Sequence, residues 1–298
     1  MKEAEFRCVK TINTENHSIF SISWSPEGKR LAVGFDYEDI EIYDIDSCKC
    51  LQSFKEEYQH FIVVTWSPDG NTIATASYDY YPKIWDVSNG QCIKILYRHR
   101  GYVQYVDFSC DGKYLLSASE DGSSKIWEVS SGKCLQTLRE DTSSVNSAKY
   151  NKDSTLIVSA SNVNNVSIWN AISGKCLQSI VAHDSYVYFA SFSPNEKYII
   201  TTAEDGDIKI WDINSLKCIK TLKGHLYETN SVSWSPCGNL LLSTSEDGTV
   251  KIWDANTGTE LQTLKDEKSY YTSAQFSPNG KYFATALDNG ILKIWSVE

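Results

Sequence analysis

The chain has 298 residues, with 28 Lys and Arg against 38 Asp and Glu and a formal net charge of −10. This balance gives no overall attraction to nucleic-acid phosphates or to anionic lipid headgroups. No apolar run approaches the roughly 18 residues that a membrane-spanning helix needs. We therefore expect a soluble protein that binds neither nucleic acid directly nor a membrane.

The first ten residues contain no apolar stretch and no small-residue cleavage site, so neither a secretory signal nor a transit peptide is predicted. We expect a cytoplasmic or nuclear protein that is not secreted. Nine Trp, 18 Tyr and 10 Phe stand against a single Met. This composition is typical of strands rather than helices, and it favours an all-β fold.

The sequence repeats with a period of 42 residues. Its clearest mark is the aromatic residue of Lys-Ile-Trp-Asp and close variants, which recurs at Tyr43, Trp85, Trp127, Trp169, Trp211, Trp253 and Trp295. Seven such units account for 294 of the 298 residues. A fixed period of this length predicts a repeat architecture, and we expect residues 1–298 to form one domain without a linker.

Each unit predicts four short antiparallel strands, as the sixth unit illustrates in chain order. A first strand ends at Trp234 and is followed by a Ser-Pro-x-Gly turn, in which Pro presets φ for a type I turn. A second strand of small residues covers 240–245 and leads through an acidic turn to a third strand that ends at Trp253. A fourth strand covers 261–264. Turns at this spacing are typical of an all-β repeat.

The fourth-strand position shows how the repeats close. Glu260 occupies it in one unit, and cysteine occupies it in the six others: Cys8, Cys50, Cys92, Cys134, Cys176 and Cys218. One fourth strand therefore precedes the first complete unit, and none follows Trp295. We expect residues 6–12 to pair beside residues 291–297, so that both ends of the chain share the last unit and no unpaired edge remains.

The nine cysteines do not form a metal-binding or disulfide pattern. Six share one periodic strand position, which predicts small buried hydrophobic side chains. No pair of Cys-x-x-Cys motifs and no Cys/His cluster is present, so no metal site is expected. Gly-rich phosphate loops are absent as well, and no cofactor is predicted.

The unit resembles the WD repeat, which has a Gly-His dipeptide upstream and Trp-Asp at the end of its third strand. The best match runs from Gly224-His225 to Trp253-Asp254, and the resemblance covers the whole chain. It implies a closed, seven-bladed β-propeller of four-stranded antiparallel blades, with the last blade completed by an N-terminal strand.

The same resemblance implies a structural relay of four polar side chains in each blade. By position, the relay is complete in three blades, as His99, Ser117, Asp121 and Trp127, as His183, Thr201, Asp205 and Trp211, and as His225, Ser243, Asp247 and Trp253. Four blades depart from it. The His is replaced by Glu15, Glu57, Asp141 and Glu267, and the turn Asp by Tyr37, Val163 and Asn289, so other contacts must hold those loops.

Pro82 interrupts a predicted third strand, because proline cannot donate to a strand ladder. We expect residues 78–82, Tyr-Asp-Tyr-Tyr-Pro, to form a distorted, protruding turn. Local sequence drift or an aromatic contact surface would both account for it.

By analogy with the family, partners dock on the top face, where the relay His loops and Asp turns surround the mouth of the central channel. Three upward positions per blade give 21 residues, among which are no Lys or Arg, five Tyr, one Phe and six carboxylates. Aromatic rings beside acids predict a surface that holds a cationic side chain. An alternative is that the acids are solvated and the rings only cover the blade tops. The candidate partner-binding residues, with Tyr80 from the protruding turn, are Phe20, His60, Tyr78, Tyr80, Tyr102, Glu120, Tyr186, Tyr188, Glu204, Glu228, Glu246, Tyr270 and Asp288.

These observations predict a non-catalytic scaffold that binds a peptide or protein bearing Lys or Arg, as a monomeric ring within a larger complex. One alternative is an enzyme or small-ligand binder that uses the channel mouth, since fold alone excludes neither. No converging nucleophile, His and carboxylate can be placed there from sequence. A second alternative is a ubiquitin-ligase substrate receptor. It is weakened because no Arg stands at the third position from the aromatic of any unit and because the upward positions lack the Arg cluster that phosphopeptides require.

Overall fold

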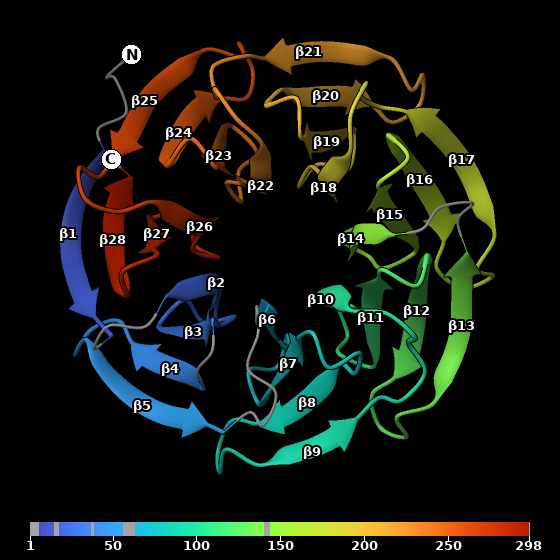
Figure 1. Ribbon diagram of the computed structural model, residues 1–298, viewed down its shortest axis with the longest axis horizontal. Coiled ribbons are helices and arrows are strands. Elements are labelled where there is room, and N and C mark those ends of the chain that lie inside the picture. Colours follow the sequence, from blue (N-terminus) through green and yellow to red (C-terminus); the bar gives the residue numbers. More distant parts are fainter. Residues whose placement is uncertain (1–5, 15–17, 37–38, 56–62, 140–143, 298) are drawn as a thin grey trace.

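The computed structural model describes residues 6–14, 18–36, 39–55, 63–139 and 144–297. These residues form seven four-stranded antiparallel sheets arranged as blades of a ring (Figure 1). The predicted all-β, seven-bladed propeller is confirmed.

Within each blade the strands follow one another from the channel outwards. The innermost strands are β2 Ile19–Trp24, β6 Val63–Trp66, β10 Val103–Phe108, β14 Val145–Tyr150, β18 Val187–Phe192, β22 Thr229–Trp234 and β26 Tyr271–Phe276. The second strands are β3 Arg30–Phe35, β7 Thr72–Ala76, β11 Tyr114–Ser119, β15 Leu156–Ser161, β19 Tyr198–Ala203, β23 Leu240–Ser245 and β27 Tyr282–Leu287.

The third strands are β4 Ile40–Asp44, β8 Lys83–Asp86, β12 Ser123–Glu128, β16 Asn165–Asn170, β20 Ile208–Asp212, β24 Thr249–Asp254 and β28 Ile291–Val297. The outermost strands are β1 Phe6–Asn13, β5 Lys49–Phe54, β9 Cys92–Ile95, β13 Cys134–Arg139, β17 Cys176–Val181, β21 Cys218–Leu222 and β25 Glu260–Lys265. Blade one begins at β2 and blade seven at β26, in chain order.

The ring closes in blade seven, where β1 from the N-terminal end lies outside β28 (Figure 1). The two strands are antiparallel and pair from Phe6 with Val297 to Asn13 with Ile291. This confirms the predicted closure. The edge of β28 is thereby covered by the chain itself.

Apolar side chains pack between neighbouring blades. Leu31 of blade one shares a buried cluster with Leu292 of blade seven, and Val250 of blade six shares another with Phe283 of blade seven. Each blade therefore buries its faces only when both neighbours are present. This mutual burial makes the ring one cooperative unit.

Polar side chains link the innermost strands, which are not paired with one another in a sheet. The backbone N–H of Val64 donates to Ser21 Oγ at 3.1 Å, and that of Tyr150 donates to Asp107 Oδ2 at 2.9 Å. Exposed strand edges need partners for their backbone groups. These side chains supply them along the channel wall.

The expectation that the repeated cysteines are buried is wrong. Five of the six are exposed, and Cys134 is half-buried. Cys134 pairs with Trp127 at a register shift between β12 and β13, and its thiol donates to the carbonyl of Gln136 at 3.3 Å. The cysteine thus stands where the outermost strand shifts its register against the third strand. That strand has no further layer outside it to bury the thiol.

Candidate partner-binding face

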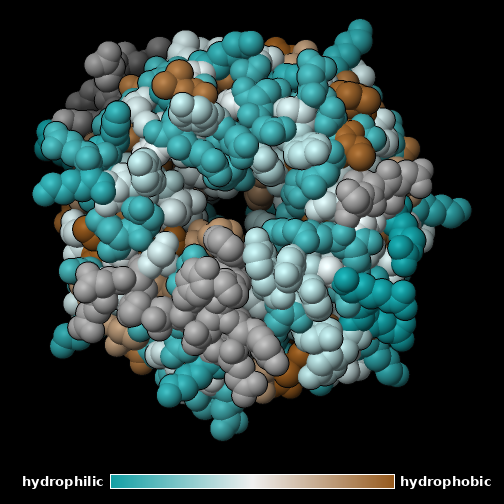
Figure 2. Space-filling view, viewed as in Figure 1, coloured by the Kyte–Doolittle hydropathy of each residue, from teal (hydrophilic) through white to brown (hydrophobic). Residues whose placement is uncertain are grey.

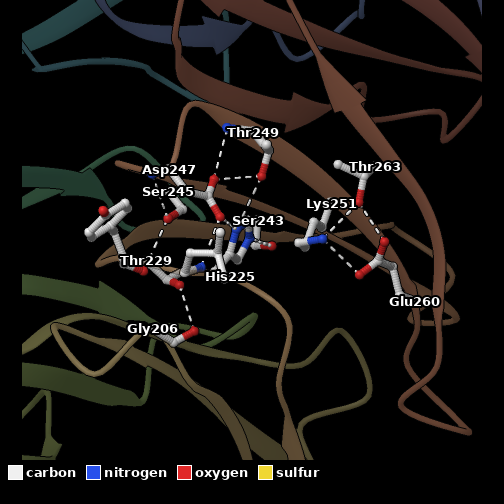
Figure 3. A network of polar contacts seen from close by, with 12 residues as sticks. Gly206, His225, Thr229, Ser243, Ser245, Asp247, Thr249, Lys251, Glu260 and Thr263 are labelled. Carbon is white, nitrogen blue, oxygen red and sulfur yellow. Dashed lines mark hydrogen bonds and ion pairs between the residues drawn. The ribbon is translucent and has the colours of Figure 1, made fainter.

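The predicted relay of blade six forms a continuous hydrogen-bonded chain, and Figure 3 shows its His225, Ser243 and Asp247 members. Trp253 Nε1–H donates to Ser243 Oγ at 2.9 Å, and the Ser243 hydroxyl donates to His225 Nε2 at 2.7 Å. His225 Nδ1–H then donates to Asp247 at 3.0 Å. This order gives every polar atom a partner only when the imidazole is neutral. The relay fastens the loop before β22 to the turn after β23.

The same chain of contacts occurs in blades three and five. His99 contacts Asp121 at 2.8 Å and Ser117 at 2.7 Å, and Trp127 donates to that serine at 2.8 Å. In blade five, the nearest distances are 2.9 Å from the His183 ring to Asp205 and 2.8 Å to Thr201, which also accepts from Trp211 at 3.0 Å. In blades three, five and six, the histidine, the hydroxyl residue, the aspartate and the tryptophan are thus joined by hydrogen bonds.

Burial and hydrogen bonds lower the pKa values of two relay histidines and of a relay aspartate. Burial lowers the pKa of His99 and of His225, and outweighs the neighbouring carboxylates that would raise it. Burial alone would raise the pKa of Asp247. Hydrogen bonds from Thr249, the backbone N–H of Leu226 and His225 outweigh it, so the pKa lies below its usual value. The neutral imidazole and the ionised carboxylate are thus both favoured.

Blades without a complete relay use other contacts. Trp85, Trp169 and Trp295 keep the indole bond to a second-strand hydroxyl, at 2.9, 2.8 and 2.9 Å. In blade seven, Lys293 pairs with Asp266 at 2.8 Å, next to the exposed Glu267 that replaces histidine. The substitutes Glu15, Glu57, Asp141 and Tyr37 lie outside the described residues.

The central channel has a cavity volume of about 1210 Å³, and its opening is visible at the centre of Figure 2. Hydrophilic side chains border much of the opening in this view. Nine of the predicted partner-binding residues line the channel: Phe20, Tyr78, Glu120, Tyr186, Tyr188, Glu228, Glu246, Tyr270 and Asp288. Tyr80, Tyr102 and Glu204 are not part of the lining, and His60 lies outside the described residues.

The channel mouth is acidic. Glu228 accepts a hydrogen bond from the Tyr188 hydroxyl at 2.9 Å, and burial together with this carboxylate raises the pKa of Tyr188. Among the ion pairs between described residues, none involves Glu120, Glu204, Glu228 or Glu246. The negative charge of these four carboxylates is therefore not neutralised by a described lysine or arginine.

Lys149 is the one cation in the described channel lining, and the sequence analysis missed it. Its ammonium lies 5.9 Å from the centre of the Tyr105 ring and 5.6 Å from that of Phe189. Burial would lower the pKa of Lys149, but Tyr105 and Asp107 outweigh burial and raise it. Lys149 lies near the far end of β14, below the three upward positions that were considered. The sequence did contain a signal for Lys149, because the matching position holds Ser in three other blades.

The predicted tyrosine cluster divides into two groups. Tyr102 stacks on Tyr78 with ring centres 4.2 Å apart, and it contacts Tyr80 at 5.1 Å. Tyr186 and Tyr188 belong to blade five, and blade four separates them from this stack (Figure 1). No ring contact between the two groups occurs among the described residues. The repeat register located each tyrosine on the correct blade but did not bring all five together.

Two exposed apolar residues on the top loop of blade six were also missed. Leu226 is 83% and Tyr227 is 64% exposed. They directly follow the relay histidine. The exposure of this loop could have been inferred from the sequence, because the residue that follows the relay histidine is the charged Arg100 in blade three and the charged Asp184 in blade five.

Comparison with known proteins agrees with this geometry. A family model described as "WD domain, G-beta repeat" matches residues 132–170, 174–212, 216–254 and 258–296, together just over half of the chain. The fold and the relays define a β-propeller built from such repeats, and the chain belongs to the WD-repeat family. A second model, described as "Eukaryotic translation initiation factor eIF2A", matches residues 1–141. The search of curated proteins found no match.

Two further observations concern the described ranges. They contain no helix that is long and apolar enough to cross a membrane. They also contain no group of three or more His, Cys, Asp or Glu side chains placed to hold a metal ion.

Proposed function

We propose that this WD-repeat propeller is a non-catalytic scaffold in the cytoplasm or nucleus. It binds a Lys- or Arg-bearing segment of a protein or peptide at the top face, as a monomeric ring within a larger complex. The observation that carries this proposal is the set of carboxylates at the channel mouth that have no described cationic partner.

The side chains around these carboxylates support the same function. Tyr186 and Tyr270 are 48% and 64% exposed at the rim. Tyrosine contributes large contact area at a small cost in conformational entropy and is enriched where interfaces concentrate their binding energy. The carboxylates attract a basic segment and orient it, and the rings then pack against its aliphatic stems.

Affinity capture from the source cell tests the proposal. The bait is the full chain, compared with a Glu228→Gln/Glu246→Gln variant. A matched control, Asp111→Asn/Asp153→Asn, removes two carboxylates from the turns at the opposite ends of the innermost strands. We expect the top-face variant to lose a partner that the control retains. Retention of every partner by the top-face variant would refute the proposed site.

A role in translation initiation is a second candidate, and only the match to the initiation-factor model over blades one to three favours it. Sucrose-gradient sedimentation of cell extract tests it. Comigration of the protein with small ribosomal subunits that survives nuclease treatment would support this role. Sedimentation at the top of the gradient under all conditions would rule it out.

A further inference from the structure

Tyr80 adopts a strained backbone conformation in the turn between β7 and β8. Its φ is 71°, in the left-handed region that a bulky side chain rarely adopts. The matching positions of five other blades hold residues that tolerate this region well: Gly122, Asn164, Gly206, Gly248 and Gly290. The sixth, Glu38 of blade one, lies outside the described residues. The fold therefore does not require a tyrosine at this turn.

A side chain at this turn position can crowd the tyrosine of the next blade, as blade six illustrates. In blade six, a Cβ at Gly248 would lie 2.5 Å from Cδ1 of Tyr270. Tyr102 is the equivalent of Tyr270 in blade three. Its ring packs against that of Tyr80 with an interplanar angle of 30°. Backbone strain at a position that glycine or asparagine could occupy without strain is characteristic of functional sites.

The result is a stack of three rings at the edge of the channel mouth. Tyr102 contacts both Tyr78 and Tyr80, and the Tyr80 side chain remains 39% exposed. Glu120 lies close to this stack, because its backbone N–H donates to the carbonyl oxygen of Tyr102 at 2.9 Å. Burial and then Glu120 raise the pKa of Tyr78. The Glu120 carboxylate accepts a hydrogen bond from Gln104 at 2.7 Å. It has no ion-pair partner among the described residues.

We propose that Tyr80, Tyr102 and Glu120 form a subsite that prefers an arginine side chain of the partner over a lysine. This inference rests on the proposed function and specifies the chemistry of its ligand. A planar guanidinium can lie flat on the Tyr80 ring and donate N–H groups to the Glu120 carboxylate at its edge. An ammonium is a compact, strongly hydrated charge and cannot stack in this way.

Two synthetic peptides test the preference: acetyl-Gly-Ser-Gly-Arg-Gly-Ser-Gly-amide and the same peptide with lysine in place of arginine. Each is titrated into the full chain, and binding is followed by NMR of labelled tyrosine rings. We expect the arginine peptide to bind at least about threefold more tightly. Tyr80→Asn, which installs the residue found at position 164, should abolish the difference. Glu120→Gln should weaken the arginine peptide more than the lysine peptide.

Matched variants separate a lost subsite from a lost fold. Tyr80→Phe keeps the ring and should keep the preference, while Tyr282→Ala removes an exposed tyrosine from the opposite end of blade seven and should change neither affinity. Equal binding of the two peptides to the wild type, or a preference that survives Tyr80→Asn, would overturn the subsite.

If both peptides bind equally and both weaken in Glu228→Gln/Glu246→Gln, the proposed function stands and the arginine subsite falls. A third peptide with proline at the central position should bind more weakly than the arginine peptide. Tighter binding of that peptide would show that the rings instead receive an apolar segment.

Discussion

Lys83 and Asp79 form an ion pair of 2.5 Å inside blade two, and their side chains are only 9% and 4% exposed. Asp79 occupies the turn position at which Asp121 contacts His99 in blade three. In blade two the cationic partner of this aspartate comes from the third strand of the same blade. Lysine at the matching position of blade three makes a different contact, from Lys125 to Thr137.

Breaking this ion pair should destabilise the ring strongly. We expect Lys83→Met to lower the free energy of unfolding by about 3 kcal/mol, because the buried Asp79 carboxylate keeps its hydrogen bonds from Ser77 and the Tyr81 backbone but loses the lysine that pairs with its charge. The double variant Lys83→Met/Asp79→Leu should recover part of this loss. Urea denaturation of the three proteins measures both effects. A single variant as stable as the wild type would show that the pair is not buried in solution.

The relay of blade five should matter more for stability than a carboxylate of blade one that lies outside any relay. Asp205→Ala removes the partner of His183 and should cost about 1–3 kcal/mol. Asp36→Ala changes a half-buried channel-lining residue and should cost less than about 0.5 kcal/mol. Chemical denaturation of the two variants tests the difference, and equal midpoints would contradict it.

The N-terminal strand should be essential for closure. Deleting residues 1–12 removes most of β1 and exposes the edge of β28. We expect aggregation or a lower melting temperature, because an unpaired strand edge is a site for intermolecular pairing. Light scattering and thermal melting measure the two outcomes. A soluble monomer with unchanged melting temperature would argue against closure by β1.

Stability should fall on acidification below about pH 6.5, the ordinary pKa of histidine. His99 and His225 have lowered pKa values in the folded chain, so the unfolded chain binds more protons as the pH falls through this range. A second loss follows at lower pH, below the ordinary pKa of aspartate, because the pKa of Asp247 is lowered in the folded chain. Urea midpoints across this range test both steps. His225→Gln should flatten the first step, and a midpoint that rises on acidification would contradict the prediction.

Tyrosines on the top face should contribute to partner affinity. We expect Tyr102→Ala or Tyr188→Ala to weaken binding of a captured partner by more than about 1 kcal/mol with little change in melting temperature. Glu120→Lys should slow association, because charges at an interface act on encounter rates, and should also speed dissociation of an arginine-bearing partner, because it removes the hydrogen-bond acceptor of the proposed subsite. Calorimetry at two salt concentrations and stopped-flow kinetics measure these effects. Affinity that depends instead on the side or bottom of the ring would refute the assignment.

The sequence by itself determined the number of blades, the order of their strands, the closure by residues 6–12 and the three complete relays. The blade number, the strand order and the closure follow from the 42-residue period, because turn chemistry and strand alternation are local properties that a repeat displays seven times. The relays are what the resemblance of the unit to the WD repeat implies. Within blade six, His225, Ser243, Asp247 and Trp253 could be assigned because they stand at the positions that form the relay in the family that the unit resembles.

Only the tertiary structure decided what lies opposite each side chain. It placed Cys134 on an outer strand without a covering layer and Lys149 between the rings of two other blades. It paired Lys83 with Asp79, and it stacked Tyr80 on Tyr102 while leaving Tyr188 on another blade. These contacts join different strands or different blades. A linear period specifies positions within the repeat, whereas burial and pairing across blades depend on the particular side chains that the closed ring brings together.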